Sequence, residues 1–313
     1  MKTYNRRTLV SLMGSAALTA CAAPQTVSQS VTDPFEGGIG GTGIVGQLTD
    51  FGSLVVNGLR VELTSRTRIA TAYGDTTDSA LTRGQSLTLY ATRSRDRLVA
   101  QRITIDYALV GVVRRTAGGL TVNGVPVETD TGTAGRAVPG RRAAISGTWH
   151  AGGVVATRID QPPDGPDLIA GTLERRSGTG PSVGGAALVG PTGGTAPGSY
   201  ITAFGRATER GFETDRVASG RFNGIGDLRQ LSVDGYLEPV EGNPGFRVAG
   251  LGHSFARDLR LAPLSGRRAI YFGRYAGVFR AQLGLVVPDT FPARRALLRD
   301  GYADGFRGEV LRL

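Results

Sequence analysis

Histidine is the residue type from which acid–base chemistry would be expected, and this chain of 313 residues has only two, His150 and His253. His253 lies three residues after Gly250, at a strand position expected to face inward, opposite Phe246. It could act as a proton donor or ligand inside a barrel, but one histidine without visible partners forms neither a metal site nor a catalytic triad. We therefore expect a backbone group to satisfy His253, and we predict that the protein is not an enzyme.

Carboxylates and glycines offer no stronger catalytic pattern. The pairs Asp75/Asp78 and Asp164/Asp167 fall in turn-like segments, where aspartate commonly stabilises turns and caps. Residues 38–43 match the glycine spacing of a dinucleotide-binding loop, yet no strand is expected before them and no helix after them. We predict no cofactor and no metal.

Arginine dominates the charged residues and is the candidate for binding chemistry. The chain has 36 basic and 26 acidic residues, and its formal net charge is +10. Three candidate arginines recur near the end of a strand and four form adjacent pairs: Arg102, Arg158, Arg216, Arg141, Arg142, Arg267 and Arg268. They could bind lipid head groups, acidic polysaccharide or nucleic acid, or they could be solvated strand edges that resist aggregation. No clear cluster of aromatic residues accompanies the pairs, so nucleic acid is the partner we expect least.

The only cysteine, Cys21, indicates a membrane anchor. Residues 2–7 supply three positive charges, and residues 8–18 are an apolar stretch that is too short to span a bilayer but suits a signal peptide. The following Leu18-Thr19-Ala20-Cys21 resembles the lipobox of bacterial lipoproteins. The resemblance implies cleavage between Ala20 and Cys21 and acylation of the Cys21 thiol, which would hold the protein on an extracytoplasmic membrane surface, the periplasmic face of the outer membrane. Export by the general or by the twin-arginine route stays open.

Beyond a tether at residues 21–42, one pattern occurs four times. A glycine with aliphatic residues two positions before and after it, the alternation of a half-buried strand, is found at Gly46, Gly111, Gly171 and Gly235. A tight turn follows each, at Asn57-Gly58, Asn123-Gly124, Gly184-Gly185 and Ala249-Gly250. Asn-Gly favours a type I′ hairpin, so Val56 should face Leu59 and Leu54 should face Val61.

Two more strands are expected after each hairpin, beyond a polar link. Five strands in this order describe a small OB-like barrel, and a unit of about 60 residues is marginal unless it stacks on its neighbours. The predicted architecture is all-β. A signal peptide (residues 1–20) and a tether (residues 21–42) precede four tandem five-stranded OB-like barrels, and a tail (residues 289–313) follows them. The four barrels are expected at residues 43–107, 108–161, 167–218 and 228–288. The tail could form two helical turns near residues 293–299 or a strand near residues 306–313.

The first of these units resembles a known family. Residues 41–46, Gly-Thr-Gly-Ile-Val-Gly, and residues 51–58, Phe-Gly-Ser-Leu-Val-Val-Asn-Gly, are similar to a bacterial family of domains of unknown function, number 5666. The resemblance is close over residues 41–63 and extends to Ile105, and the second unit keeps the Val-Asn-Gly turn. It implies an exported, often lipid-anchored bacterial protein made of small β-barrels, and it offers no catalytic residues.

Together these features predict a non-catalytic exported lipoprotein that acts as a binding or scaffolding module of the cell envelope. The expected partners are the membrane, through the lipid on Cys21, and an envelope protein or an anionic polymer. The alternative function is binding of an anionic polymer through the arginine pairs on the barrels.

Overall fold

The computed structural model describes residues 40–175, 178, 180–239, 246–252, 264–299, 302 and 309–312. Their regular structure is almost entirely β-strand, with one α-helix, α1 (Phe291–Leu298), and two short 3₁₀ turns. None of these helices is long and apolar enough to cross a membrane. The all-β prediction is confirmed. The predicted signal peptide, the cleavage site between Ala20 and Cys21, and the tether up to residue 39 lie outside the described residues.

Residues 43–107, called unit one, lie in a closed five-stranded barrel. The strands pair in the cycle β1–β2–β3–β7–β6–β1, with bounds β1 (Gly41–Asp50), β2 (Leu54–Val56), β3 (Leu59–Glu62), β6 (Ser86–Ser94) and β7 (Arg97–Asp106). Within this cycle, only β3 and β7 are parallel neighbours. This is the strand order expected of an OB-like barrel. A hairpin that the sequence pattern did not predict, β4 (Arg68–Thr71) and β5 (Gly74–Thr76), extends the sheet from β7.

Residues 108–161 (unit two) and 167–218 (unit three) pair their strands in the same order. In unit two the cycle β8–β9–β10–β12–β11–β8 uses β8 (Leu109–Thr116), β9 (Gly119–Val122), β10 (Val125–Glu128), β11 (Arg142–His150) and β12 (Gly153–Asp160). In unit three the first strand is divided at Leu173, and the strands are β13 (Asp167–Thr172), β14 (Glu174–Arg175), β15 (Pro181–Val183), β16 (Ala186–Val189), β17 (Tyr200–Thr208) and β18 (Gly211–Ser219).

Residues 228–288 (unit four) keep part of this pattern. The described strands are β19 (Leu228–Pro239), which pairs with β20 (Phe246–Val248) and β21 (Arg268–Tyr275), and β22 (Phe279–Val286), which pairs with β21. The third strand is expected directly after the Ala249-Gly250 turn, and from residue 253 on it lies outside the described residues, so the closure of this unit and the count of four barrels stay predictions. The tail forms both of its alternatives, helix α1 and strand β23 (Val310–Arg312), which pairs antiparallel with β22.

The hairpin registers follow the sequence pattern. Val56 lies opposite Leu59 and Leu54 opposite Val61. Asn57 and Gly58 have φ values of 55° and 75°, and the second Asn-Gly turn is alike. A type I′ turn requires positive φ at both central positions, so the Asn-Gly dipeptides set the strand pairing as predicted.

One backbone hydrogen bond recurs in all four units. The donor is the N–H of the glycine that precedes the fourth strand of the unit. The acceptor is a carbonyl of the first strand, two residues after the glycine of that strand. These bonds are Gly84 to Leu48 (2.8 Å), Gly140 to Val113 (2.8 Å), Gly198 to Leu173 (2.7 Å) and Gly266 to Leu237 (2.9 Å). All four donor glycines have φ between 72° and 87°, a conformation that glycine adopts without strain.

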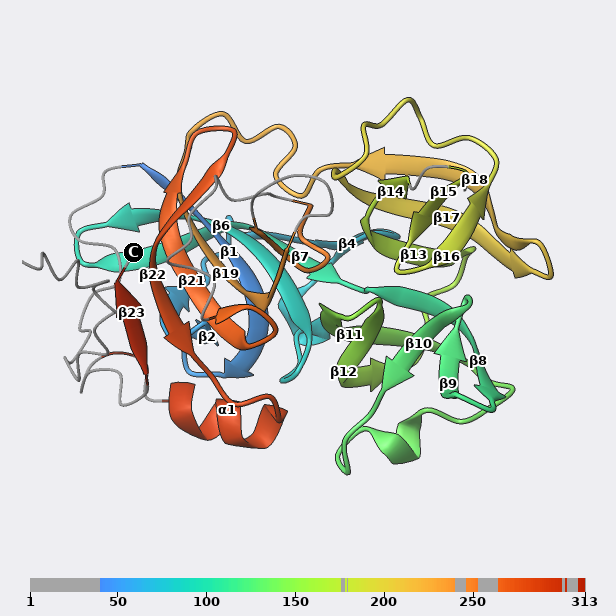
Figure 1. Ribbon diagram of the computed structural model, residues 1–313. Coiled ribbons are helices and arrows are strands. Elements are labelled where there is room, and N and C mark those ends of the chain that lie inside the picture. The colour runs from blue at the N-terminus through green and yellow to red at the C-terminus, as the bar shows by residue number, and fades with distance from the viewer. Residues whose placement is uncertain are drawn as a thin grey trace, which may run out of the picture.

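The first strands of the units join the barrels in pairs. β1 lies parallel to β19, which links units one and four, and β8 lies antiparallel to β13, which links units two and three. Figure 1 shows blue β1 beside orange β19 and β21, with the green and yellow strands of the other pair grouped on the opposite side. The end of the described chain thus returns to its beginning, so the units do not stack in a simple row.

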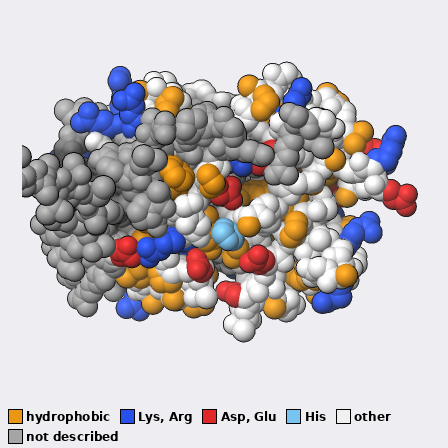
Figure 2. Space-filling view, viewed as in Figure 1, with side chains coloured by type: hydrophobic (Ala, Val, Ile, Leu, Met, Phe, Trp, Pro, Cys, Tyr) orange, Lys and Arg blue, Asp and Glu red, His pale blue; other side chains and the backbone are white. Residues whose placement is uncertain are grey.

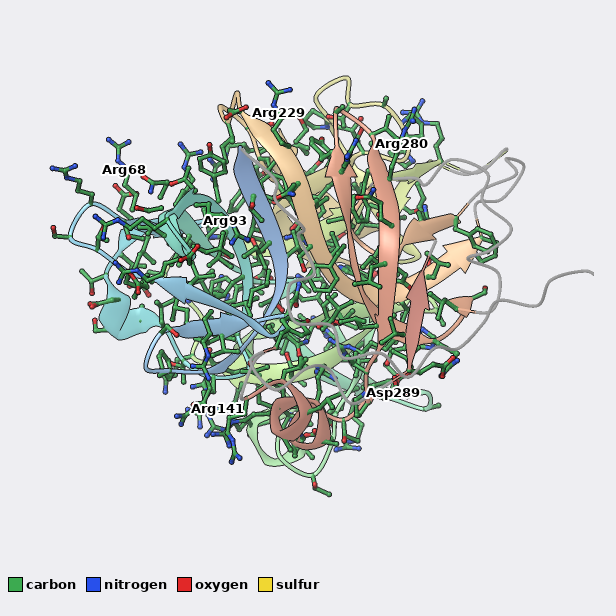
Figure 3. All side chains as sticks on the ribbon, turned by 90° about the vertical axis from the view of Figure 1, so that its left-hand side faces the viewer. Arg68, Arg93, Arg141, Arg229, Arg280 and Asp289 are labelled. Atoms are coloured by element: carbon green, nitrogen blue, oxygen red, sulfur yellow. The ribbon has the colours of Figure 1, made fainter. Side chains whose placement is uncertain are left out.

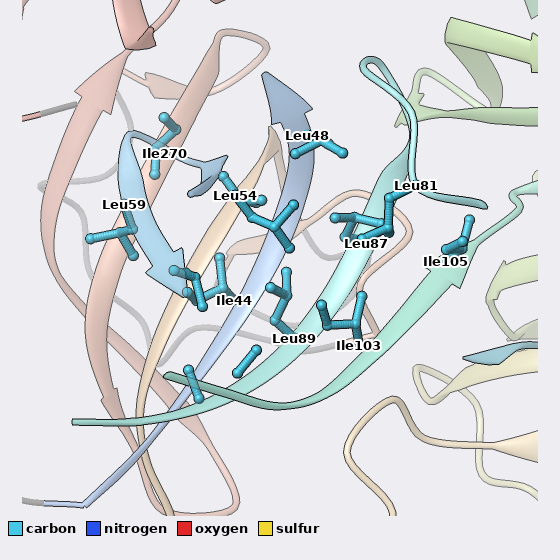
Figure 4. Packing of buried hydrophobic residues seen from close by; sticks show 14 of the residues in the cluster. Ile44, Leu48, Leu54, Leu59, Leu81, Leu87, Leu89, Ile103, Ile105 and Ile270 are labelled. Carbon is cyan, nitrogen blue, oxygen red and sulfur yellow. The ribbon is translucent and has the colours of Figure 1, made fainter. Parts of the chain in front are cut away.

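Side chains that point inward from the strands form the hydrophobic cores. Figure 4 shows the interior of unit one, where Ile44, Leu48, Leu87, Leu89 and Ile103 have no exposed surface. The same cluster continues into the outer side of unit three, through residues such as Leu168 and Phe204. Units two and three share most of a second cluster, and a third cluster lies mainly in unit four. Unit three therefore packs its outer face on unit one, and this contact creates the candidate site.

Candidate ligand site between units one and three

A cavity of about 230 Å³ lies between the outer faces of units one and three. Its lining includes aromatic rings, threonine hydroxyls and guanidinium groups, from Thr104, Tyr107, Tyr200, Thr202, Phe204 and Arg216. Two other cavities, of about 40 and 20 Å³, have room for little more than water. The cavity between units one and three is therefore the better candidate for a ligand.

Strand alternation places these side chains. On β17, Ile201 and Ala203 point into the core of unit three, so Tyr200, Thr202 and Phe204 point outward to the cavity. On β7, Ile103 and Ile105 belong to the interior of unit one, and Thr104 between them lines the cavity. Successive strand residues face opposite sides of a sheet, so the patterns that fill the two cores also determine the cavity walls.

Arg216 is the cation of the cavity that has no acidic partner within the described part of the chain. It lies opposite Phe204 in the β17–β18 pair, and its guanidinium carbon is 4.0 Å from the centre of the Phe204 ring. Among the described residues it forms no ion pair, and its side chain is exposed. Contact with the face of the ring leaves the N–H groups at the edge of the guanidinium free to donate to an anion.

The second guanidinium of the cavity, that of Arg221, is already neutralised. It donates to Asp106 at 2.6 Å and to the hydroxyl of Thr88 at 2.9 Å, and it lies 3.9 Å from the centre of the Tyr200 ring. Burial raises the pKa of Asp106 despite the opposing effect of Arg221. Burial also raises the pKa of Tyr200 to about 12. Because Arg221 balances Asp106, the uncompensated positive charge of the cavity is that of Arg216.

The three recurring arginines of the sequence do not form one site. Arg216 lines the cavity, and Arg102 is exposed and donates to the carbonyl of Asn223 at 3.1 Å. Arg158 is partly buried, pairs with Asp160 at 2.7 Å, and contacts the carbonyl of Arg83. Equivalent positions in the sequence pattern therefore have different surroundings, because each unit has different neighbours.

The four arginines of the two candidate pairs differ in burial: Arg141 and Arg267 are exposed, Arg142 is partly buried, and Arg268 is buried. Arg268 has almost no exposed surface and forms a bidentate ion pair with buried Asp234, at 2.9 and 2.8 Å, so it cannot meet an external polymer. Arg142 binds Asp167 and the carbonyls of the linker between units two and three. Arg267 pairs with Glu309, and Arg141 is exposed without a partner among the described residues. Figure 2 shows basic side chains spread mainly over the margins of one face.

The histidines contribute no described catalytic cluster. His253 lies outside the described residues, so its predicted position opposite Phe246 stays a prediction. His150 stacks on Tyr236, with ring centres 4.0 Å apart. Over the described part of the chain, no group of three or more His, Cys, Asp or Glu side chains is arranged to hold a metal ion.

The cavity itself was not found from the sequence. Its aromatic residues and its arginines belong to different units and to the linker after unit three, so no local stretch contains them together. The one available signal was outward-facing Tyr200 and Phe204 on a strand whose inward positions are already apolar. Apolar residues on both faces of a strand indicate that the outer face is covered.

The strand cycle of unit one defines the class of this domain, a small closed β-barrel with OB-like pairing. Residues 42–104 match the family described as Domain of unknown function (DUF5666), so a domain of this family spans unit one from β1 to β7. The resemblance read from the sequence is confirmed for this segment. No curated protein and no solved structure matches the chain.

Proposed function

We propose that the protein is a non-catalytic binding module of the cell envelope, built of repeated barrels related to the DUF5666 domain and anchored by lipid on Cys21. The ligand is a small anionic group held in the cavity between units one and three. The observation that supports this most directly is Arg216, stacked on Phe204 and free of any acidic partner among the described residues.

Charge and shape together favour an anionic ligand with a ring. Arg216 supplies the positive charge that Asp106 does not neutralise, and its planar guanidinium suits bidentate recognition of a carboxylate, sulfate or phosphate. Thr104 and Thr202 supply hydroxyl groups, and Tyr107, Tyr200 and Phe204 supply apolar walls. At about 230 Å³ the cavity is below the range of about 300–1,000 Å³ usual for drug-sized ligands. The ligand group that fits is a single ring.

The membrane anchor rests on the lipobox alone. Two measurements on growing cells test it: incorporation of labelled palmitate into the full chain, and fractionation of the envelope. We expect label and membrane association with native Cys21 and neither with Cys21→Ala. Label that persists in Cys21→Ala would contradict the anchor without affecting the cavity.

Calorimetric titration of the mature chain tests the cavity. We expect D-galacturonate, which has a ring and a carboxylate, to bind at least about tenfold more tightly than uncharged D-galactose. Arg216→Gln should remove this preference, because the amide keeps much of the length but not the charge. Arg141→Gln is the matched control, since Arg141 is equally a surface arginine without a described partner and lies in unit two. Equal binding by Arg216→Gln and the native protein would refute the proposed site.

A further inference from the structure

We infer that the cavity is the end of a longer site for an acidic polysaccharide, whose chain leaves the cavity over the outer face of β7 and β4. This inference rests on the proposed function, because it needs a sugar acid in the cavity. It adds a polymeric ligand and a second group of contacts, Arg102 and Arg68.

The two arginines lie on a direct continuation of the cavity wall. β4 and β7 are parallel, with Ala70 beside Thr104 and Arg68 beside Arg102. Thr104 lines the cavity, and Arg102 is two residues away on the same face of β7, a distance of about 6.6 Å along a strand. Ile69 and Ile103 belong to the core of unit one, so the arginines beside them point outward. Figure 3 shows Arg68 projecting away from the ribbon.

The charges on this outer face favour an anionic chain. Arg68 is exposed and has no acidic partner among the described residues, and the Arg102 interaction that the structure gives is with the carbonyl of Asn223. Neighbouring strands are about 4.8 Å apart, so the two cations form one close pair. Asp75 on β5 is an acidic residue that borders this row, because it lies beside Ala70. Its negative charge would repel an anionic chain, so removing that charge should strengthen the binding of the chain.

The rings of the site argue for sugar rather than nucleic acid. Single-stranded nucleic acids bind by stacking bases on open aromatic faces. Here the guanidinium of Arg216 covers Phe204, and that of Arg221 covers Tyr200, at 4.0 and 3.9 Å from the ring centres. Tyr107 is only 9% exposed. The threonine hydroxyls of the cavity can instead hydrogen-bond to the hydroxyl groups of a sugar.

Calorimetric titrations of the mature chain with D-galacturonate and with tetragalacturonate test the inference. We expect the tetramer to bind at least tenfold more tightly than the monomer, with the difference reduced by added salt. The double variant Arg68→Gln/Arg102→Gln should lose the tetramer's advantage and keep the affinity for the monomer. Asp75→Asn should strengthen binding of the tetramer alone. Arg141→Gln, which lies outside both groups of contacts, should change neither.

The failures of the two proposals are distinguishable. Equal affinities for monomer and tetramer would overturn the polymeric site and leave the cavity site standing. Absence of binding by the monomer, with an unchanged thermal transition, would refute the proposed function itself. An oligothymidylate that binds more tightly than tetragalacturonate, and competes with it, would overturn the assignment to polysaccharide.

Discussion

Trp149 of unit two donates its indole N–H to the carbonyl of Ala170 in unit three, at 3.0 Å. Ala170 immediately precedes Gly171, the glycine of its first strand. Units one and two make the equivalent bond within themselves, from Asn57 to the carbonyl of Val45 (3.0 Å) and from Asn123 to that of Val110 (2.9 Å).

Unit three has no asparagine at this place, because its turn is Gly184-Gly185. The Trp149 ring takes the space of the missing side chain, so that a Cβ at Gly184 would overlap it and a Cβ at Gly171 would lie 3.0 Å from it. A Cβ at Gly250, in the turn of unit four, would also overlap Trp149. In unit three, the only tryptophan thus supplies from unit two the hydrogen bond that an asparagine supplies within units one and two.

Trp149→Phe should therefore destabilise the protein by about 1–2 kcal/mol, since it keeps an aromatic ring but leaves the buried Ala170 carbonyl without its donor. Urea unfolding followed by circular dichroism measures the change. Phe51→Leu is the control, because Phe51 is 41% exposed, and its effect should stay within about 0.5 kcal/mol. A Trp149→Phe variant as stable as the native protein would contradict the role of the indole bond.

Gly46→Ala should cost about 3 kcal/mol, because a Cβ at this position would overlap the carboxamide of Asn57. That carboxamide also donates to the hydroxyl of Ser232 in unit four at 2.9 Å, so a shift would disturb the contact between the units. Asn57→Gly removes the obstacle, and the double variant should be clearly less destabilised than the sum of the single changes. Unfolding free energies of the four proteins form the test.

The control for this cycle is Gly135→Ala, where no atom would lie within 4 Å of the new Cβ. We expect it to change stability by less than about 0.5 kcal/mol. Strict additivity of Gly46→Ala and Asn57→Gly would show that the two side chains do not compete for space.

These contacts show which parts of the structure could be predicted from the sequence. The spacing of the glycines and the Asn-Gly turns predicted the hairpins and registers of units one and two correctly, because a hairpin register depends on residues that are near one another in the sequence. It did not predict that Asn57 would fold back on Gly46, because a turn residue of that type is explained by its positive φ alone. The partners of Arg268 and Arg142, and the cavity beside Arg216, depend on how units distant in sequence pack, and no local pattern encodes that.

Arg268→Met should destabilise the protein by about 3–5 kcal/mol, because it leaves the buried carboxylate of Asp234 without its main partner. Burial alone would raise the pKa of Asp234, but the guanidiniums of Arg268 and Arg294 together hold it below its usual value. Arg97→Met is the matched control, since its pair with Glu62 is exposed and should be worth less than about 1 kcal/mol. Equal shifts of the urea unfolding midpoint in the two variants would contradict the prediction that the buried ion pair matters more to stability than the exposed one.

Tyr200→Phe should make the protein less sensitive to alkaline pH. Burial raises the pKa of Tyr200 to about 12, whereas an unfolded chain releases this proton near pH 10. The folded protein therefore holds the proton more tightly, and the resulting stability is complete below about pH 10 and is lost as the pH rises through about 12. Urea unfolding across this interval should show a shallower decline for Tyr200→Phe. The decline should not vanish, because burial also raises the pKa of Tyr73 and of Tyr236 to about 12. Parallel curves for variant and native protein would mean that the Tyr200 phenol is solvated in the folded state, which would contradict this prediction.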